Sequence, residues 1–316
     1  MAAAASRIAP AGGGPSPLVL EFAQVDGMRV RLGHARPDGR PRGTVLVLPG
    51  RAEFIEKYRE TLADLTSAGF AVVTLDWRGQ GGSDRFILRR QPDHVTRFEA
   101  YLADLAAVHD RLRQLALPEP HLLLAHSMGG HIGLRYLHDH PGQFAGAMMT
   151  APMFGIRLRA MPEPLARAIC RAAIALGAST RYAPGQRDVD LARFVFATNK
   201  LTTSPERYAA FLRQLADTPD MALGGVTYGW LDAAFRSLQV ARRPGYLEAI
   251  RTPILVCQAG AELIVSNRAQ EAAVRRLPHG RLAHFPGARH ELLMERTEIR
   301  QQVIDSFEAF VAGLTR

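Results

Sequence analysis

The sequence predicts an α/β fold in which a mostly parallel central sheet is covered by helices and carries an inserted helical cap. Two observations lead to this prediction. Short apolar, β-branched runs alternate with amphipathic segments over residues 44–150 and again over 253–314, a pattern typical of parallel sheets with helices on both faces. Between them, residues 154–246 contain helical pieces punctuated by prolines and no convincing strand. We therefore expect a core of residues 18–153 and 247–316 and a cap of residues 154–246.

The core elements can be justified in chain order. Residues 18–26 and 28–34 are predicted to form two strands joined by a tight turn at Asp26-Gly27. The run over 44–48 stops at Pro49-Gly50 and suits a buried central strand. The same periodicities predict helices over 56–67, 98–115, 129–140, 269–277 and 295–314, and strands over 70–75, 122–126, 145–150, 253–257 and 282–285. In such a sheet, ligands bind at the carboxyl ends of the strands.

The composition is that of a globular protein with an unusual charge. Of 316 residues, 47% are hydrophobic and 22% charged, and the formal net charge is +9. A basic surface attracts anionic lipid or nucleic acid. The arginines are scattered, without a basic run interleaved with aromatic residues, so nucleic-acid binding is not expected. Contact with an anionic membrane surface stays open, and it would be peripheral because no apolar stretch approaches the ~18 residues of a spanning helix.

The N-terminal segment and the cysteines bear on localisation. Residues 1–17 consist largely of Ala, Gly and Pro and lack the apolar core of a signal peptide, so we expect a disordered leader. Cys170 and Cys257 lie far apart in apolar runs, which predicts two buried thiols and fits a reducing compartment. We expect a cytoplasmic protein, with peripheral contact to the inner membrane as the open alternative.

One stretch has the character of a nucleophile turn. An apolar strand over 122–125 leads into His126-Ser127-Met128-Gly129-Gly130, a sharp turn into a helix that would push the Ser127 hydroxyl out of the sheet. The pattern departs from the common one, because Ala125 stands where glycine is usual. A serine hydroxyl attacks well only when a base removes its proton and an acid orients that base. The rest of the chain must supply both.

The expected chain order is serine, acid, histidine. Glu262 lies in the loop after the strand over 253–257, and His290 lies in the loop after the strand over 282–285. Both loops emerge at the edge of the sheet where Ser127 is expected. Other groups fit less well. Five histidines near the turn should point away from Ser127, pack in the core or lie on the surface. Two aspartates come too early in the chain, and one glutamate is adjacent to the base. These residues are His121, His126, His131, His138, His140, Asp76, Asp84 and Glu291.

An acyl-transfer site also needs an oxyanion hole, which is built from backbone N–H groups. Met128 directly follows the nucleophile and supplies one such group. The second should come from the loop after the strand over 44–48. Pro49 has no N–H and Gly50 permits an unusual turn, which leaves Arg51 as the expected donor through its main chain.

These segments resemble the α/β-hydrolase superfamily, and within it the branch of bacterial lysophospholipases and monoacylglycerol lipases. The resemblance extends from about residue 18 to the end. Its general motifs are His126-Ser127-Met128-Gly129-Gly130, Asp76-Trp77-Arg78-Gly79-Gln80-Gly81 and Gly287-Ala288-Arg289-His290-Glu291. Monoacylglycerol lipases usually begin the oxyanion loop with His-Gly. The lysophospholipases are more similar in Pro49-Gly50-Arg51 with Glu53 and Lys57-Tyr58, and in the cap segments 196–202 and 224–230.

The resemblance implies an α/β-hydrolase fold and a triad of Ser127, Glu262 and His290. It also implies that Arg51 and Met128 form the oxyanion hole and that Trp230 and Phe154 contact the acyl group of the substrate. We expect hydrolysis of a lysophospholipid through an acyl-enzyme, with a small lipid ester as the binding partner and no metal or organic cofactor. The alternatives are a monoacylglycerol lipase, a general carboxylesterase, or an idle hydrolase fold that only binds.

Overall fold

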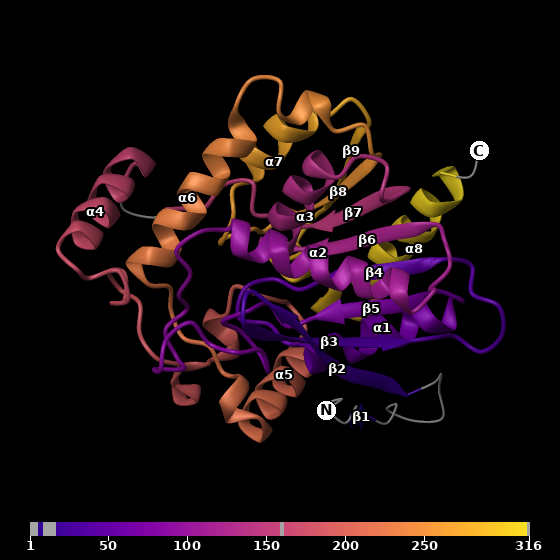
Figure 1. Cartoon of the computed structure of the whole chain (residues 1–316), viewed down its shortest axis with the longest axis horizontal. Helices are drawn as coiled ribbons and strands as arrows, with labels where there is room; N and C mark the ends of the chain where they lie inside the picture. Colours follow the sequence, from indigo (N-terminus) through magenta and orange to yellow (C-terminus); the bar gives the residue numbers. More distant parts are fainter. Residues whose placement is uncertain (1–5, 9–16, 159–160, 315–316) are drawn as a thin grey trace.

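The computed structural model of the chain describes residues 6–8, 17–158 and 161–314. Within these residues, nine strands form one sheet in the order β1-β2-β3-β5-β4-β6-β7-β8-β9 (Figure 1). Pairing is antiparallel from β1 to β5 and parallel from β5 to β9. The strands are β1 (Ser6–Ile8), β2 (Leu18–Val25), β3 (Met28–Ala35), β4 (Thr44–Leu48), β5 (Ala71–Leu75), β6 (His121–His126), β7 (Gly146–Thr150), β8 (Ile254–Ala259) and β9 (Gly280–Phe285).

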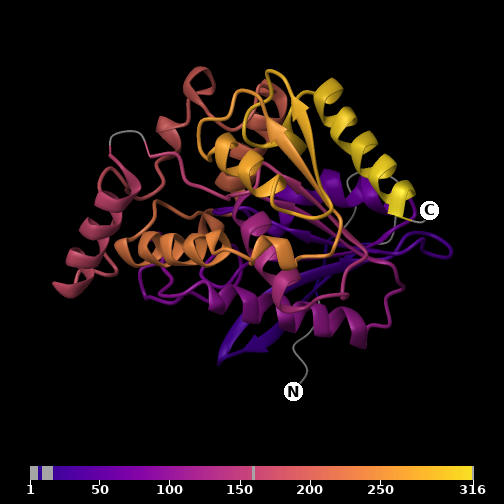
Figure 2. The same cartoon turned by 90° about the horizontal axis from the view of Figure 1, so that it is seen from above.

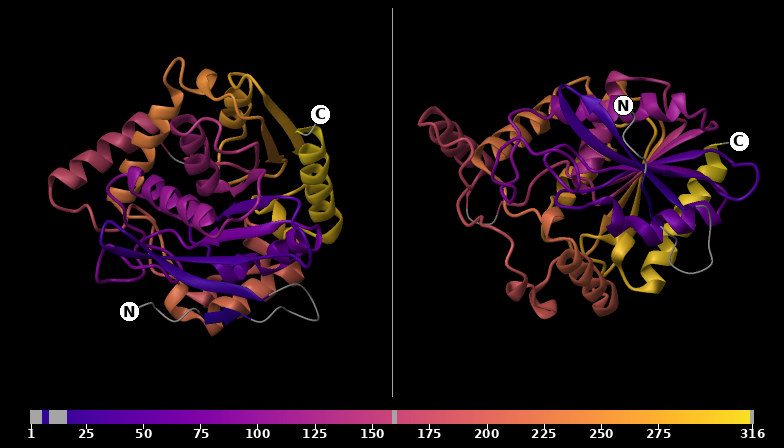
Figure 3. Two further views of the ribbon diagram at one scale, coloured as in Figure 1. Left: turned by 45° about the vertical axis from the view of Figure 1, so that its right-hand side comes forward. Right: turned by 60° about the horizontal axis from the view of Figure 1, so that its bottom comes forward.

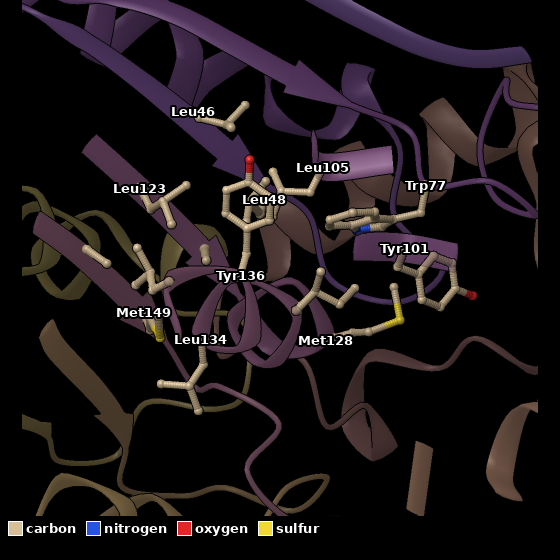
Figure 4. Close-up of a cluster of buried hydrophobic side chains, with 14 of the residues drawn as sticks. Leu46, Leu48, Trp77, Tyr101, Leu105, Leu123, Met128, Leu134, Tyr136 and Met149 are labelled. Atoms are coloured by element: carbon tan, nitrogen blue, oxygen red, sulfur yellow. The ribbon is translucent and has the colours of Figure 1, made fainter. Parts of the chain in front are cut away.

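Helices cover both faces of this sheet, as the alternating pattern predicts. α1 (Arg59–Ser67) and α8 (Thr297–Leu314) pack on one face. α2 (Glu99–Gln114), α3 (Ser127–Asp139) and α7 (Asn267–Val274) pack on the other (Figure 2). Strands β4 to β7 are buried along their whole length, because a parallel sheet with two covered faces has no solvent side. Figure 4 shows part of this core, where side chains of β4, β6 and β7 meet α3.

The segment between β7 and β8 is helical. It contains α4 (Glu163–Ala175), α5 (Pro205–Asp217) and α6 (Tyr228–Arg242). Two of the prolines that suggested a cap lie in the first turns of α4 and α5, where the missing N–H costs no helical hydrogen bond. Ser204 and Thr227 cap α5 and α6 through their side-chain oxygens. Short 3-10 turns complete the chain: η1 (Ile55–Tyr58), η2 (Leu191–Arg193), η3 (Phe196–Thr198), η4 (Pro219–Met221), η5 (Leu247–Ala249) and η6 (Leu292–Met294).

The N-terminal segment requires a correction. Residues 6–8 pair antiparallel with Leu18, Val19 and Leu20 as strand β1, so the expectation of disorder over 1–17 is wrong at these three positions. The reason is that β2 offers an edge of unpaired backbone groups to which a short segment can bond. The remainder of the predicted leader, residues 1–5 and 9–16, lies outside the described residues.

Two further expectations concern burial and membrane spans. Cys170 and Cys257 are both buried free thiols, as predicted. Burial raises the pKa of the Cys257 thiol to about 12, which makes it inert. Among the described residues, no helix combines the length and the apolar composition that crossing a bilayer requires.

Candidate active site

Ser127 stands at the first position of α3, directly after β6. Its φ of 50° lies in the left-handed region that non-glycine residues rarely adopt, so the turn is strained in the way the sequence predicts. Glycine at 129 permits this geometry, because a Cβ there would lie 2.5 Å from the carbonyl oxygens of Leu48 and Pro49. The departure at Ala125 causes no close contact with the facing helix: a Cβ at Gly133 would lie 3.8 Å from that of Ala125, an ordinary van der Waals distance.

The structure brings the three predicted triad residues into contact. His290 Nε2 lies 2.9 Å from Ser127 Oγ, and His290 Nδ1 lies 2.7 Å from Glu262 Oε2. All three side chains are buried. A carboxylate only accepts hydrogen bonds, so Nδ1 must donate to it. Nε2 is then the acceptor and faces the serine hydroxyl, which is the arrangement a general base needs.

Glu262 is held in place from its other side. Its Oε1 accepts hydrogen bonds from the backbone N–H groups of Ile264 at 2.7 Å and Val265 at 3.2 Å. Burial by itself raises the pKa of this carboxyl, but the hydrogen bond from His290 and the two backbone donors outweigh it and leave the pKa below its usual value. Glu262 is therefore an anion at neutral pH and can orient the imidazole.

The rival bases and acid have other partners. His126 Nδ1 faces the carbonyl of Thr150 at 3.0 Å, and His131 Nε2 lies 2.7 Å from Ser237 Oγ. Burial lowers the pKa of His126 to about 4 and that of His131 to about 3, so both rings are neutral at pH 7. Glu291 accepts from Lys57. None of these contacts includes Ser127.

The loop after β4 leaves one N–H group unpaired where the oxyanion hole is expected. The N–H of Gly50 donates to Glu53, and that of Ala52 donates to Gln80. Between them, the N–H of Arg51 has no acceptor among the described residues. The N–H of Met128 belongs to the first turn of α3, where helical acceptors are missing. Both expected donors are thus available to a substrate oxygen.

A cavity of about 500 Å³ adjoins Ser127. Most of its wall is apolar and comes from α4, α6 and the segments beside them, including Ile169, Trp230 and Leu231. The charged residues of the wall are Arg51, Arg157 and Lys200, with no carboxylate among the described lining residues. The cavity therefore suits a molecule with an apolar chain and a negative charge.

Of the two residues expected to contact the substrate, Trp230 lies in the cavity wall and Phe154 does not. Trp230 lines the cavity beside Ser127. Phe154 does not, because its side chain packs inward in the main core and borders a separate cavity of about 180 Å³ with Leu134 and Leu238. The expectation for Phe154 is therefore wrong, because its side chain is turned away from the cavity beside Ser127.

Two of the three basic residues in the cavity wall, Arg157 and Lys200, were not predicted from the sequence as site residues. Arg157 was one of many scattered arginines and carried no distinguishing signal. For Lys200 a signal existed: Lys57 and Lys200 are the only lysines in the chain, and Lys57 is buried beside the loop of His290.

Comparison with known proteins finds one family model and several relatives that match this chain. The family model described as serine aminopeptidase, S33 matches residues 39–297. Lysophospholipase L2 of Escherichia coli strain K12 is 36% identical over 92% of this chain and 86% of that protein. Probable lysophospholipase L2 of Haemophilus influenzae is 30% identical over 87% of this chain and 86% of that protein. Monoacylglycerol lipase of Mycolicibacterium smegmatis is 33% identical over 42% of this chain and 45% of that protein.

Solved structures with the same fold include lipases and esterases as well as an epoxide hydrolase. A soluble variant of monoglyceride lipase from Saccharomyces cerevisiae aligns with a TM-score of 0.74 at 18% identity, over 97% of this chain and 98% of that one. A thermostable carboxyl esterase from Bacillus coagulans aligns with a TM-score of 0.73 at 16% identity, over 94% and 98% of the two chains. At these identities the likeness concerns the fold alone.

Proposed function

Because the chain belongs to the serine aminopeptidase, S33 family and is a serine hydrolase with the predicted α/β-hydrolase fold, we propose that it hydrolyses the acyl ester of lysophospholipids. The observation that carries the proposal is the Ser127–His290–Glu262 contact at the mouth of an apolar cavity whose charged wall residues are all basic. The extended similarity to two lysophospholipases, over most of both chains, supports the same substrate class.

In the proposed mechanism, His290 removes the hydroxyl proton while Ser127 Oγ attacks the ester carbonyl carbon. Glu262 stabilises the imidazolium that forms, and the N–H groups of Arg51 and Met128 donate to the tetrahedral oxyanion. The intermediate collapses as His290 returns the proton to the leaving alcohol, here the glycerophospho group. Water activated by the same histidine then hydrolyses the acyl-enzyme and releases the fatty acid.

The charge of the cavity wall favours a lysophospholipid over a monoacylglycerol. Both have one acyl chain, but only the lysophospholipid has a phosphodiester. Arg51 Nη1 donates to the carbonyl of Gly224 at 2.9 Å and to the buried carboxylate of Asp93 at 3.3 Å, so this guanidinium is held beside Ser127 as one half of an ion pair. A phosphate oxygen can accept from such cations, whereas a glycerol headgroup offers them no charge.

The proposal is tested by release of fatty acid from lysophosphatidylglycerol, lysophosphatidylcholine, a monoacylglycerol of the same chain and a soluble p-nitrophenyl ester. We expect the largest kcat/KM on a lysophospholipid and no turnover by Ser127→Ala. Preference for the monoacylglycerol or for the soluble ester would assign the chain to the corresponding alternative. An idle fold would give no turnover and no labelling of Ser127 by a fluorophosphonate.

We further propose that α4 rests on an anionic membrane surface. The helix forms the outer edge of the molecule (Figure 3). Its residues Ala166, Ile169 and Cys170 line the cavity. Leu165 in its first turn and Leu176, which follows its last residue, are 52% and 85% exposed. Arg171 on the same helix is 60% exposed and its Nε lies 3.9 Å from Asp232 Oδ1. An apolar stripe beside cationic side chains is suited to the boundary between headgroups and acyl chains.

Co-sedimentation with vesicles tests the membrane contact. Binding to phosphatidylglycerol vesicles should exceed binding to phosphatidylcholine vesicles, and the double variant Leu165→Glu, Leu176→Glu should reduce it at least tenfold. Leu282→Glu is the matched control, because Leu282 is an exposed leucine on β9, far from α4 in the sequence. Equal binding by the double variant and the control would contradict the proposed surface.

A further inference from the structure

A buried ionic cluster lies behind the triad and takes no part in the mechanism above. It consists of Glu53, Lys57 and Glu291, all buried. Lys57 Nζ donates to Glu53 Oε1 at 2.7 Å and to Glu291 Oε1 at 2.6 Å. The hollow between these groups measures about 10 Å³, which is too little for more than a single water. Both carboxyl groups therefore contact the ammonium of Lys57 directly.

The second oxygen of Glu53 binds the oxyanion loop. Glu53 Oε2 accepts hydrogen bonds from the backbone N–H of Gly50 and from the hydroxyl of Tyr58. Gly50 is the residue immediately before Arg51, whose N–H is the proposed oxyanion donor. A Cβ at Gly50 would lie 2.8 Å from Glu53 Oε2 and 2.9 Å from His126 Cδ2. The loop is thus pressed closely against the carboxylate that holds it.

Lys57 connects this loop to the one that carries the base. Glu291 follows His290 directly, and its backbone N–H donates to the carbonyl of Leu201 at 2.8 Å. The ammonium also lies 4.6 Å from the centre of the Phe211 ring in α5, a favourable distance for a cation and a ring face. One buried cation therefore contacts the oxyanion loop, the histidine loop and the cap.

The charge state of Glu53 suits an anchoring role. Burial raises the pKa of a carboxyl group, but Lys57 and His126 outweigh it and hold the pKa of Glu53 at about 2. Burial keeps the pKa of Glu291 raised, although the same ammonium lowers it. Glu53 is therefore an anion, and a full acceptor for the Gly50 N–H, over the whole neutral range.

We propose that Glu53 is a positioning residue for the oxyanion hole: its Oε2 fixes the Gly50–Arg51 peptide through the Gly50 N–H, and Lys57 binds the other oxygen of the same carboxylate. The inference rests on the proposed function, because it requires that the Arg51 N–H stabilise a transition state. What matters at residue 53 is an acceptor oxygen at the right place, more than the charge itself.

Two substitutions separate these properties. Glu53→Gln can keep its amide oxygen on Gly50 and Tyr58, but its NH₂ then faces the ammonium of Lys57, to which Oε1 is now hydrogen-bonded. This variant therefore retains the acceptor for the Gly50 N–H and loses both the charge and the contact with Lys57, which keeps Glu291 as its partner. Glu53→Asp keeps the charge but withdraws the acceptor by one methylene. Removing an oxyanion donor costs about 10²–10³ in kcat, so we expect a displaced donor in Glu53→Asp to lower kcat about tenfold or more with KM nearly unchanged. Glu53→Gln should stay within about threefold of the unmodified protein.

A neighbouring carboxylate provides the control. Glu56 is also buried and accepts from Arg31 Nη1 at 3.2 Å, with no hydrogen bond to the oxyanion loop. Glu56→Gln should lower the midpoint of urea unfolding and leave kcat unchanged. All rates are taken with a p-nitrophenyl ester and expressed per active site titrated with a fluorophosphonate, so that partly unfolded preparations do not distort them.

The outcomes are distinguishable. If the unmodified protein shows no Ser127-dependent turnover, the proposed function fails. If it turns over and Glu53→Gln is as impaired as Glu53→Asp, the charge of Glu53 and its contact with Lys57 are what matter and not the acceptor placed on the Gly50 N–H, and the inference is overturned. Unchanged kcat in Glu53→Asp overturns it as well.

Discussion

Replacing Glu262 by glutamine tests the role of this residue in the triad, because the hydrogen bonds around it determine which way the amide group would face. Glutamine has nearly the same shape, but one of its terminal groups is an NH₂ donor. If its oxygen faced His290, that NH₂ would face the N–H groups of Ile264 and Val265, which now donate to Oε1. Two lost backbone hydrogen bonds cost roughly 1 kcal/mol each or more when buried. We therefore expect the amide oxygen to stay on the backbone and the NH₂ to face His290.

That orientation reverses the tautomer of the base. His290 Nδ1 would have to accept from the amide, so its proton would sit on Nε2, which lies 2.9 Å from Ser127 Oγ, and Nε2 could not take the serine proton. In serine hydrolases a wrong tautomer lowers kcat by about 10⁴, which corresponds to about 5.5 kcal/mol in the barrier. We expect a loss of this order in Glu262→Gln.

The assay is hydrolysis of a p-nitrophenyl ester at neutral pH, with the unfolding midpoint measured on the same preparation. Glu262→Asp is the companion variant, because it keeps the acceptor character and should retain more activity than glutamine does. A folded Glu262→Gln protein with kcat within tenfold of the unmodified enzyme would refute the reasoning, and the orienting acid would have to be sought elsewhere.

Three further predictions follow from the site and its supports. Lys200→Gln should raise KM for lysophosphatidylglycerol several-fold and leave KM for a monoacylglycerol unchanged, because only the first substrate has a charge for this cavity-wall cation to bind; equal effects on both would contradict it. His131 is neutral in the folded protein with a pKa of about 3 and titrates near 6.5 when unfolded, so stability falls as pH drops through this window. In urea titrations at pH 4–6, His131→Gln should reduce the change of unfolding free energy with pH by up to about 1.4 kcal/mol per pH unit. The same pH dependence in the variant and the unmodified protein would disprove the assignment. Gly129→Ala should cost several kcal/mol and most of the activity, since its Cβ would meet two backbone oxygens at 2.5 Å. Gly133→Ala, 3.2 Å from a Leu48 methyl, should change stability by only about 1 kcal/mol in the same urea assay.

The fold was predictable where hydrophobic pattern and strand burial coincide. The expected strand over 44–48 matches β4, and the expected strand over 70–75 differs from β5 by one residue. Fully buried parallel strands are continuous apolar runs, and such runs have clear ends. Helix ends were less accurate: α7 begins at Asn267 and not at 269. Its N-cap, Ser266, accepts from the N–H of Ala269, a signal that hydrophobic spacing does not contain.

The contacts among Ser127, Glu262 and His290 follow from topology, because parallel strands deliver the loops after them to one edge of the sheet. The walls of the cavity do not follow in this way. Arg157 and Lys200 come from the cap, where prolines and short turns set the path of the chain and no periodicity fixes which side chains point inward. Phe154 illustrates the same limit, because one turn of the backbone after β7 decides whether its ring faces substrate or core.

The surroundings of Lys57 explain why this position holds a lysine in an arginine-rich sequence. The chain has 39 Lys and Arg residues, of which only two are lysine. An ammonium is a compact point charge with freely directed donors, whereas a guanidinium is a wide planar fork. Around Lys57 Nζ, two carboxylate oxygens lie at 2.6 and 2.7 Å and an aromatic ring lies at 4.6 Å, with about 10 Å³ of space left. A guanidinium does not fit there without separating Glu53 from Glu291, and their separation would move the oxyanion loop away from His290. The lysine at this position thus follows from the same distances that hold the two catalytic loops together.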